Sequence, residues 1–297
     1  LMGEAGAQVT VVDAAPQDVM QPSVDALKEY DNIAFKFGPY DFADFKDADL
    51  VWVGAGTPLH EPVLQQCREA GIALKQSAAL FAELAKIPII GVTGTRGKST
   101  VTHMIHHVLS QVTGERILLG GNIRGVSNLQ LLKDVQPESI AVMELDSWQL
   151  QGWGWAGISP QIAVFTNFME DHLNYYQDAL PRTSDVLGAD AEVPTAKEAA
   201  MALYFNDKAQ IFLHQEDNAT LITTPDVFEL IKTFSQEHAE SKGSDPLLQL
   251  QQGGSASPRA ALGLAGEVVL ADASVIPEDA LLAMPGEHNR LNAALAY

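Results

Sequence analysis

The sequence predicts an α/β protein built on parallel sheets, and three observations support this class. Short apolar segments alternate with amphipathic segments of helical period, the pattern of strands joined by crossover helices. Several of the apolar segments end in glycine or in a polar residue. One of them runs into a glycine-rich turn and a helix, as in P-loop proteins. Because ligands of open α/β sheets bind beyond the carboxyl ends of the strands, we expect the functional groups at that edge.

The first part of the chain reads as a Rossmann-like domain, one of the two domains that 297 residues suggest. A strand over Val9–Val12 ends in the acid Asp13, and the apolar segment ADLVWVGAG closes on Gly54 and Gly56. The segment HEPVLQQCREAGIAL then predicts a helix followed by a strand, and ALFAELAK predicts a short helix. We therefore expect a parallel-sheet domain over residues 1–86.

Residues 87–297 read as a P-loop-type central ATPase domain. The apolar segment IPIIGVTG leads into the glycine-rich turn, and a helix over Lys98–Gln111 follows it. ESIAVMELDSWQL and PQIAVFTNFMEDH predict two further buried strands with polar ends. A stretch rich in alanine, proline and acids near 178–198 predicts a loop insertion. Four separate segments should therefore place polar residues on one edge of the sheet.

The charge balance excludes several classes of partner. The net charge is −20 and the pI is about 4.6, whereas nucleic acids and anionic membranes require clustered lysine and arginine. The lone cysteine, Cys67, rules out an internal disulfide and fits a reducing compartment. No segment approaches 18 uninterrupted apolar residues, and no signal sequence opens the chain. We expect a cytoplasmic monomer that binds neither nucleic acid nor membranes.

The turn GVTGTRGKST has the chemistry of a phosphate-binding loop. Its backbone N–H groups and the positive end of the following helix would face phosphate oxygens. Lys98 would reach the β- and γ-phosphates, and the hydroxyl of Ser99 would reach Mg²⁺. The glycines are shifted from the standard pattern, because Val92 stands six places before the lysine. A turn that merely caps a helix is the alternative. The residues expected to bind ATP here are Gly94, Thr95, Gly97, Lys98, Ser99 and Thr100.

The shifted glycines fit G-x-T-G-T-x-G-K-[ST], the nucleotide loop of the Mur ligase superfamily, which this chain resembles in four further segments. These segments come in the family's order and are GGNIRG, VMELDSWQL, TNFMEDHLNYY and GEHNRLNAALA. Five ordered motifs across most of residues 87–297 are more specific than any single one. The form of the second and the last of the four is most similar to the branch that joins D-glutamate to UDP-N-acetylmuramoyl-L-alanine. The first domain matches less well, because Gly54-Ala55-Gly56 stands where the family has Ser-Pro-Gly.

The resemblance implies an ADP-forming ligase of peptidoglycan precursor synthesis, with ATP and two Mg²⁺ ions. Its partners would be the UDP-linked muramoyl-alanine and D-glutamate. Joining a carboxylate to an amine at neutral pH requires a leaving group better than hydroxide, which ATP supplies as an acyl phosphate. The amine of D-glutamate would attack it, and a tetrahedral intermediate would collapse. Mg²⁺ prefers oxygen ligands and screens the triphosphate from the approaching carboxylate.

The resemblance also assigns the metal ligands. Glu144, at a strand end, would hold the first ion together with Ser99; a solvated acid is the alternative. His172 would bind the second ion, while Asp171 and Glu170 orient it or bind water.

One lysine has a special role in this family, since CO₂ converts it to a carbamate near the second ion. Lys208, in YFNDKAQIF, matches its local context. Carbamylation requires the neutral amine, which burial favours. Lys197 is the rival, although it lies within the expected insertion. Catalytic roles therefore fall to Lys98, His172 and Lys208.

The remaining contacts come from both domains. Asn289 and Asn292, three residues apart on one helix face, would bind adenine; ordinary polar groups at a helix start are the alternative. Asn122 would touch the phosphates or the substrate carboxylate, and Asp13 would contact uracil. The expected substrate-binding residues are Asp13, Gly54, Gly56 and Asn122.

Both ends of the chain read as interrupted. Leu1 is not a start methionine, and the chain stops within a helical pattern. We expect that the start of the UDP-binding domain and a C-terminal domain that binds the amino acid are missing. The piece alone should then bind nucleotide weakly and show little or no ligation.

Other functions remain open at this stage. A sister Mur ligase or a folylpolyglutamate-type ligase would add a different amino acid through the same chemistry. A nucleotide-hydrolysing binding protein would use the loop without ligation, and a catalytically inactive binding module would use neither. The intact set of Lys98, Ser99, Glu144 and His172 favours a ligase.

Overall fold

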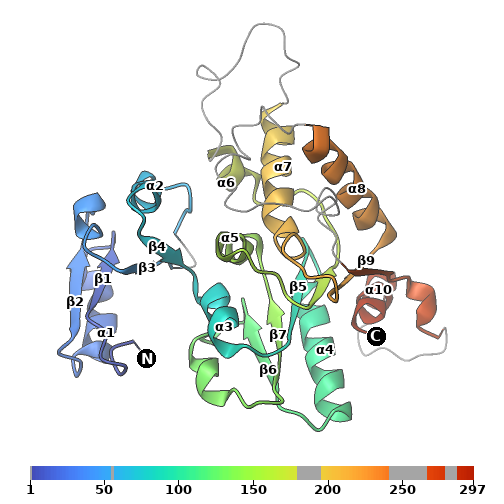
Figure 1. Cartoon of the computed structure of the whole chain (residues 1–297), viewed down its shortest axis with the longest axis horizontal. Helices are drawn as coiled ribbons and strands as arrows, with labels where there is room; N and C mark the ends of the chain where they lie inside the picture. Colours follow the sequence, from blue (N-terminus) through green and yellow to red (C-terminus); the bar gives the residue numbers. More distant parts are fainter. Residues whose placement is uncertain (1, 55–56, 179–194, 241–265, 278–285) are drawn as a thin grey trace, which may run out of the picture. The chain divides into compact units, whose positions relative to one another are not determined.

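A computed structural model describes residues 2–54, 57–178, 195–240, 266–277 and 286–297. The chain separates into two compact units, Leu1–Lys75 and Gln76–Tyr297. Each unit is an α/β structure with parallel strands, which confirms the predicted fold class (Figure 1).

The first unit contains two separate parallel pairs of strands. Strand β1 (Val9–Asp13) pairs with β2 (Ile33–Phe37), and helix α1 (Gln17–Leu27) connects them. Strand β3 (Leu50–Trp52) pairs with β4 (Ala73–Lys75). Helix α2 (Pro62–Glu69) connects the second pair, and a short 3₁₀ helix, η1 (Phe42–Asp44), precedes it. Both connections are the β-α-β crossovers that the alternating sequence pattern predicts.

The second unit is built on a six-stranded parallel sheet with the order β10-β9-β8-β5-β7-β6. From one edge to the other, its strands are β10 (Glu267–Leu270), β9 (Thr220–Thr223), β8 (Ile162–Phe165), β5 (Ile89–Thr93), β7 (Ile140–Glu144) and β6 (Ile117–Gly121). Strand β5 lies in the middle, and all five of its residues are buried. A parallel sheet with both faces covered explains why its inner strands β5, β7 and β8 are nearly continuous apolar runs.

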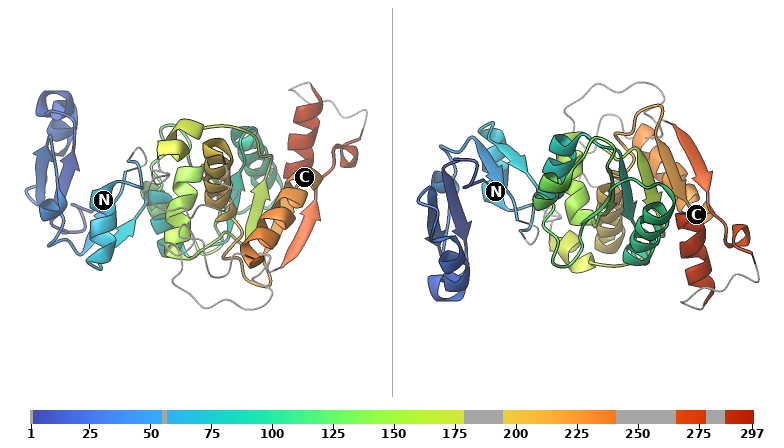
Figure 2. Two further views of the ribbon diagram at one scale, coloured as in Figure 1. Left: turned by 90° about the horizontal axis from the view of Figure 1, so that it is seen from above. Right: turned by 90° about the horizontal axis from the view of Figure 1, so that it is seen from below.

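Helices cover both faces of this sheet (Figure 2). On one face, α4 (Lys98–Val112) packs on the central strands and against α10 (Glu287–Ala296). Val101 and Ile105 of α4 share a buried cluster with Ala294 and Leu295 of α10. On the other face, α5 (Ser147–Ala156) lies between α3 (Ser77–Ala85) and α7 (Ala196–Ala209). Two shorter elements, α6 (Leu173–Asp178) and η2 (Gln130–Asp134), contact α7 and α3, respectively.

The remaining helical elements follow β9 and β10. Helix α8 (Pro225–Glu240) leaves β9, and η5 (Ala273–Val275) follows β10 and contacts α10. No helix in the described parts of the chain has both the length and the apolar character to cross a membrane.

Several elements differ in extent from the sequence expectation. The apolar run expected as one strand over ESIAVMELDSWQL ends at Glu144, because Asp146 caps a new helix with its side chain. Most of the expected insertion lies outside the described residues, but its last part forms the capped first turn of α7. The compact units divide before α3, whereas the domain expectation placed the boundary after it, at residue 86. Helix α3 joins the second unit because it packs on α5.

The core around β8 should dominate the stability of the second unit. Phe165 is fully buried on β8 and stacks on Phe205 of α7 at 6.0 Å between ring centroids. We expect Phe165→Ala to lower the free energy of unfolding by about 3–5 kcal/mol through lost burial and a cavity. Leu84→Ala, at a side chain that is 54% exposed, should change it by less than about 0.5 kcal/mol. Urea denaturation of both variants measures the difference, and equal midpoints would contradict this account of the core.

Candidate active site

The glycine-rich turn joins β5 to α4 and takes a conformation that only glycine accepts easily. Gly94 has a φ of +140° and Gly97 has a φ of +80°, both in the left-handed half of the map. A Cβ at Gly94 would lie 2.0 Å from Oγ1 of Thr166, and one at Gly97 would lie 2.7 Å from Oδ1 of Asn292. Thr166 and Asn292 therefore lie so close to the loop that positions 94 and 97 have no room for a side chain.

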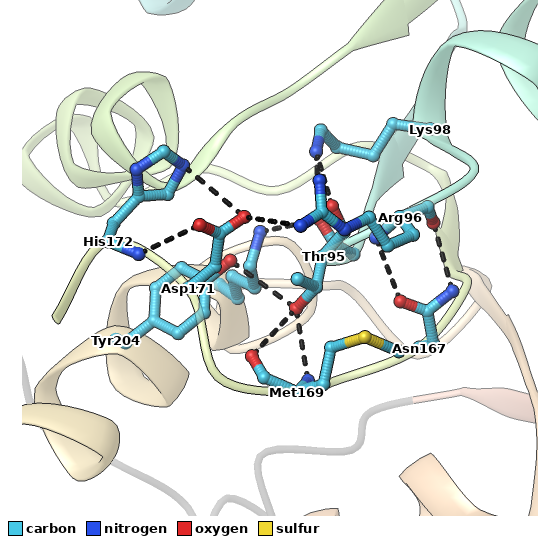
Figure 3. A network of polar contacts seen from close by, with 10 residues as sticks. Thr95, Arg96, Lys98, Asn167, Met169, Asp171, His172 and Tyr204 are labelled. Atoms are coloured by element: carbon cyan, nitrogen blue, oxygen red, sulfur yellow. Dashed lines mark hydrogen bonds and ion pairs between the residues drawn. The ribbon is translucent and has the colours of Figure 1, made fainter.

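The segment after β8 holds this loop in place through paired hydrogen bonds. Thr95 donates its N–H to the carbonyl of Asn167 at 2.9 Å, and Arg96 donates its N–H to Oδ1 of Asn167 at 2.9 Å. The hydroxyl of Thr95 donates to the carbonyl of Met169 and accepts from its N–H, both at 3.1 Å (Figure 3). The loop and the start of the NFMEDH segment are thereby one hydrogen-bonded unit.

Two lysines converge on one carbonyl of the loop. Nζ of Lys98 donates to the carbonyl of Gly94 at 3.1 Å, and Nζ of Lys208 donates to the same oxygen at 2.8 Å. Lys208 comes from α7, is 1% exposed and lies over the ring of Tyr204. Burial, followed by the charge of Lys98, lowers the pKa of Lys208 to about 7. Burial therefore favours the neutral form of this amine.

Glu144 ends strand β7 at the same edge of the sheet as the loop. Its neighbour in the register is Val92 of β5, two residues before Gly94. The side chain is 4% exposed, and Oε2 has no hydrogen-bond partner. A buried carboxylate oxygen without a donor is costly unless a cation approaches it. The chemistry of this oxygen therefore fits a magnesium ligand. Within the described residues, no three His, Cys, Asp or Glu side chains group closely enough to bind a metal by themselves.

His172 lies after β8 and directly before α6. Its φ of +54° is unusual for a residue with a side chain, and the ring is about half exposed. Nε2 lies 3.8 Å from Oδ2 of Asp171, and the rings of Trp148 and Tyr204 lie 5.1 Å and 6.3 Å from the imidazole. Asp171 in turn lies 3.9 Å from the guanidinium of Arg96 (Figure 3). These contacts connect His172 to the loop.

Helix α10 adds a cleft of about 250 Å³ beside the loop. The cleft is lined by Arg96, Gly97, Thr100, Thr166, Asn167, His288, Asn289, Leu291 and Asn292. Nδ2 of Asn292 donates to Oδ1 of Asn289 at 3.3 Å, so the two amides lie on one face of the helix. The structure thus brings the two expected adenine ligands to the phosphate loop, and their amides can pair with a nucleobase edge.

The expected substrate-binding residues come from both units, and each is described within its own unit. Asn122 is exposed after β6 and donates its N–H to the carbonyl of Glu144 at 2.7 Å. Asp13 ends β1 in the first unit, where Oδ1 accepts from the N–H of Ala15. Gly54 follows β3 in the same unit, and Gly56 lies outside the described residues.

The two rival lysines differ in environment. Lys197 lies in the exposed first turn of α7, where Nζ pairs with Glu170 at 2.5 Å. Lys208 lies in the last turn of the same helix and is buried at the loop. Glu170, which the sequence suggested as a partner of His172 or of bound water, forms this ion pair with Lys197 through Oε1.

The sequence reasoning missed a buried acid beside Lys208. Asp207 is 5% exposed and accepts a short hydrogen bond from Nε2 of Gln151 on α5. Burial raises the pKa of Asp207 to about 7, against the hydrogen bond from Gln151 that lowers it. An acid directly before a candidate lysine was the available signal, but its burial depends on the packing of α5 against α7.

Residues 92–180 match the Mur ligase middle domain. This part of the chain is a Mur ligase middle domain. It includes the loop, Glu144 and His172.

The chain is also similar to curated relatives named UDP-N-acetylmuramoylalanine–D-glutamate ligase. The relative from Borreliella burgdorferi (strain ZS7) is 30% identical over 221 residues, which is 72% of this chain and 47% of that protein. The relative from Roseiflexus sp. (strain RS-1) is 36% identical over 169 residues, which is 57% of this chain and 36% of that protein.

The Mur ligase fold extends beyond the matched segment. The solved structure of a murein peptide ligase from Psychrobacter arcticus 273-4 covers 99% of this chain, with a TM-score of 0.50 and 16% identity. At that identity the likeness concerns the fold. The chain covers 60% of that structure and less than half the length of the curated relatives.

The close approach at Gly94 gives a direct test of the loop geometry. We expect Gly94→Ala to destabilise the second unit by about 3 kcal/mol or more, because the methyl group meets Thr166 and φ is unfavourable. Gly157→Ala is the matched control, since Gly157 also has a positive φ but open space around its Cβ. It should cost about 1 kcal/mol. Chemical denaturation compares the two, and equal losses would show that the contact with Thr166 does not constrain the loop.

Proposed function

We propose that this chain is the nucleotide-binding part of a ligase that joins D-glutamate to UDP-N-acetylmuramoyl-L-alanine, with formation of ADP and phosphate. The proposal is carried by one observation: a phosphate-loop lysine, a second buried lysine and a buried acid with an unpaired oxygen meet at one edge of a Mur ligase sheet. The names of the curated relatives support the substrate pair.

Each group at this edge has a task in forming an acyl phosphate. The N–H groups of the turn and the start of α4 would bind the phosphates of ATP, and Lys98 would leave the Gly94 carbonyl to reach the β- and γ-phosphates. Asn289 and Asn292 would bind adenine in the cleft. Asn122 would hold the substrate carboxylate or a phosphate. After transfer, the D-glutamate amine attacks the acyl carbon, and phosphate leaves.

The donor set suits two Mg²⁺ ions. Mg²⁺ commonly binds one or two carboxylates together with substrate phosphates and water, so a three-residue protein cluster is unnecessary. Glu144 and Ser99 would hold one ion, and His172 with modified Lys208 would hold the other. The ions supply charge screening between the triphosphate and the carboxylate when they are bound.

Lys208 is our candidate for carbamylation. Its burial and its lowered pKa favour the neutral amine that reacts with CO₂. The carbamate would be an anion. Lys208 would then lose its present contact with the Gly94 carbonyl, and the carbamate oxygens would contact a cation. Lys197 lacks this environment because it is exposed and paired with Glu170.

The first unit would bind the UDP group through Asp13, Gly54 and Gly56, and we place the reaction in the cytoplasm of a monomeric enzyme.

Among alternatives, a sister ligase that adds another amino acid would use the same groups at the edge of the sheet that carries the loop. A nucleotide hydrolase without ligation is less well supported, because a simple hydrolase does not require His172 and a buried lysine beside the loop.

The reaction itself is testable with the full-length gene product. We expect continuous turnover of ATP to ADP and phosphate only when both UDP-N-acetylmuramoyl-L-alanine and D-glutamate are present, because without D-glutamate the reaction stops at the acyl phosphate after one ADP per enzyme. Coupled detection of ADP with each substrate omitted in turn measures this. The 297-residue chain alone should bind ATP and release little phosphate, since it covers less than half of its relatives. Rapid ATP hydrolysis without either substrate would instead support the hydrolase, and preference for another amino acid would support a sister ligase.

The two lysines of α7 make a matched pair of variants. We expect Lys208→Met to reduce the Mg²⁺-dependent part of ATP affinity by about 10- to 100-fold, because a ligand of the second ion is lost while the apolar stem remains. Lys197→Met should leave it unchanged. Isothermal titration with and without Mg²⁺ measures both variants. An equal response of the two would remove Lys208 from the metal site.

A further inference from the structure

Arg96 combines a fixed backbone with a loosely held side chain. Its carbonyl accepts from Oγ1 of Thr166 at 2.6 Å and from Nδ2 of Asn167 at 3.0 Å, while its N–H donates to Oδ1 of Asn167. The side chain is 70% exposed, and its guanidinium lies 3.9 Å from Oδ2 of Asp171 (Figure 3). The backbone position of this residue is therefore set by the loop, while its charged end is exposed and makes a long ion-pair contact with Asp171.

The location of Arg96 gives it access to a bound nucleotide. The residue lies between Thr95 and Gly97 in the turn and lines the cleft together with Asn289 and Asn292. Lys98, two residues farther along, points at the carbonyls of Gly94 and Thr95. Arg96 thus adds a cation on the same turn, within a chain whose net charge is −20. A local cation matters more in such a chain, because the overall field repels anions.

The contact with Asp171 is the kind that a phosphate can displace. An exposed pair at 3.9 Å is screened by solvent and salt and contributes little to stability. Guanidinium binds phosphate through two parallel hydrogen bonds, which are stronger and more directional. A phosphate within reach therefore outcompetes the carboxylate.

We propose that Arg96 is a phosphate-binding residue of the nucleotide site, which Asp171 holds in the absence of nucleotide and releases when a nucleoside triphosphate binds. This inference rests on the proposed nucleotide site. Nucleotide binding then has a second effect, because Asp171 loses the guanidinium and keeps the imidazole of His172, whose Nε2 lies 3.8 Å from Oδ2 of Asp171. Occupation of the loop is thereby linked to the charge around His172.

The proposal separates phosphate from nucleoside recognition, and binding experiments on the 297-residue chain can measure both. The probes are ATP and adenosine, titrated calorimetrically in Mg²⁺. Arg96→Gln should weaken ATP binding by about tenfold or more and leave adenosine binding unchanged. Arg96→Lys should recover part of the loss, since it restores the charge without the fork. Arg116→Gln is the control, because Arg116 also forms an exposed pair, with Asp134, and should have no effect.

A double-mutant cycle tests the role of Asp171. Asp171→Asn alone should tighten ATP binding by severalfold, because Arg96 no longer needs to be released. In the Arg96→Gln background the same change should have a much smaller effect. An equal effect in both backgrounds would show that Asp171 acts by general repulsion, and the holding role would be wrong.

The outcomes also distinguish this inference from the function on which it rests. If the unmodified chain and its Lys98→Ala variant both fail to bind ATP, the nucleotide site and the role of Arg96 fall together. A second outcome is that the chain binds ATP, that Lys98→Ala abolishes this binding and that Arg96→Gln leaves the ATP affinity unchanged. This outcome overturns the role of Arg96 alone. Equal loss of ATP and adenosine binding in Arg96→Gln would show that the residue only shapes the cleft. Circular dichroism of each variant confirms that the fold is retained.

Discussion

The hydrogen bonds between the glycine-rich turn and the segment after β8 hold the candidate site together. The backbone N–H groups of Thr95 and Arg96 donate to Asn167. The hydroxyl of Thr95 donates to the carbonyl of Met169 and accepts from its N–H. Because these bonds fix the turn, Gly94 presents one carbonyl to two lysines from different helices. They also hold the start of the segment that leads to His172, three residues after Met169.

Around this fixed frame, the second unit buries charged groups that would be costly elsewhere. Lys208, Asp207 and Glu144 are all nearly inaccessible to water. Burial shifts the pKa of the lysine down and that of the aspartic acid up, both to about 7. A buried charge without a partner destabilises the fold. Buried ionisable groups are therefore found mainly at functional sites, where a charged ligand can pair with them. The unpaired oxygen of Glu144 is the clearest case.

Rigidity of the backbone and freedom of side chains have different roles at this edge. The turn is clamped by backbone contacts, but the ends of Lys98 and Arg96 make contacts that a phosphate can replace. If a nucleotide binds as proposed, these side chains would exchange partners while the loop is already ordered, which would keep the entropic cost of association low. In a strongly acidic chain, a site for a polyanion depends on local groups such as these cations and the backbone N–H groups of the turn.

The sequence alone determined the parallel α/β class, the turn and the residues at the ends of β7 and β8, because these depend on local patterns of apolar residues, glycines and polar ends. The motif order was enough to indicate the family. Only the tertiary structure decided that Asp146 caps a helix, that Lys208 is buried at Gly94 while Lys197 faces solvent, and that Asp207 lies beside it. These depend on how α5 and α7 pack across the sheet. Contacts between residues more than 50 positions apart, such as that of Gln151 with Asp207, leave no local signal in the sequence.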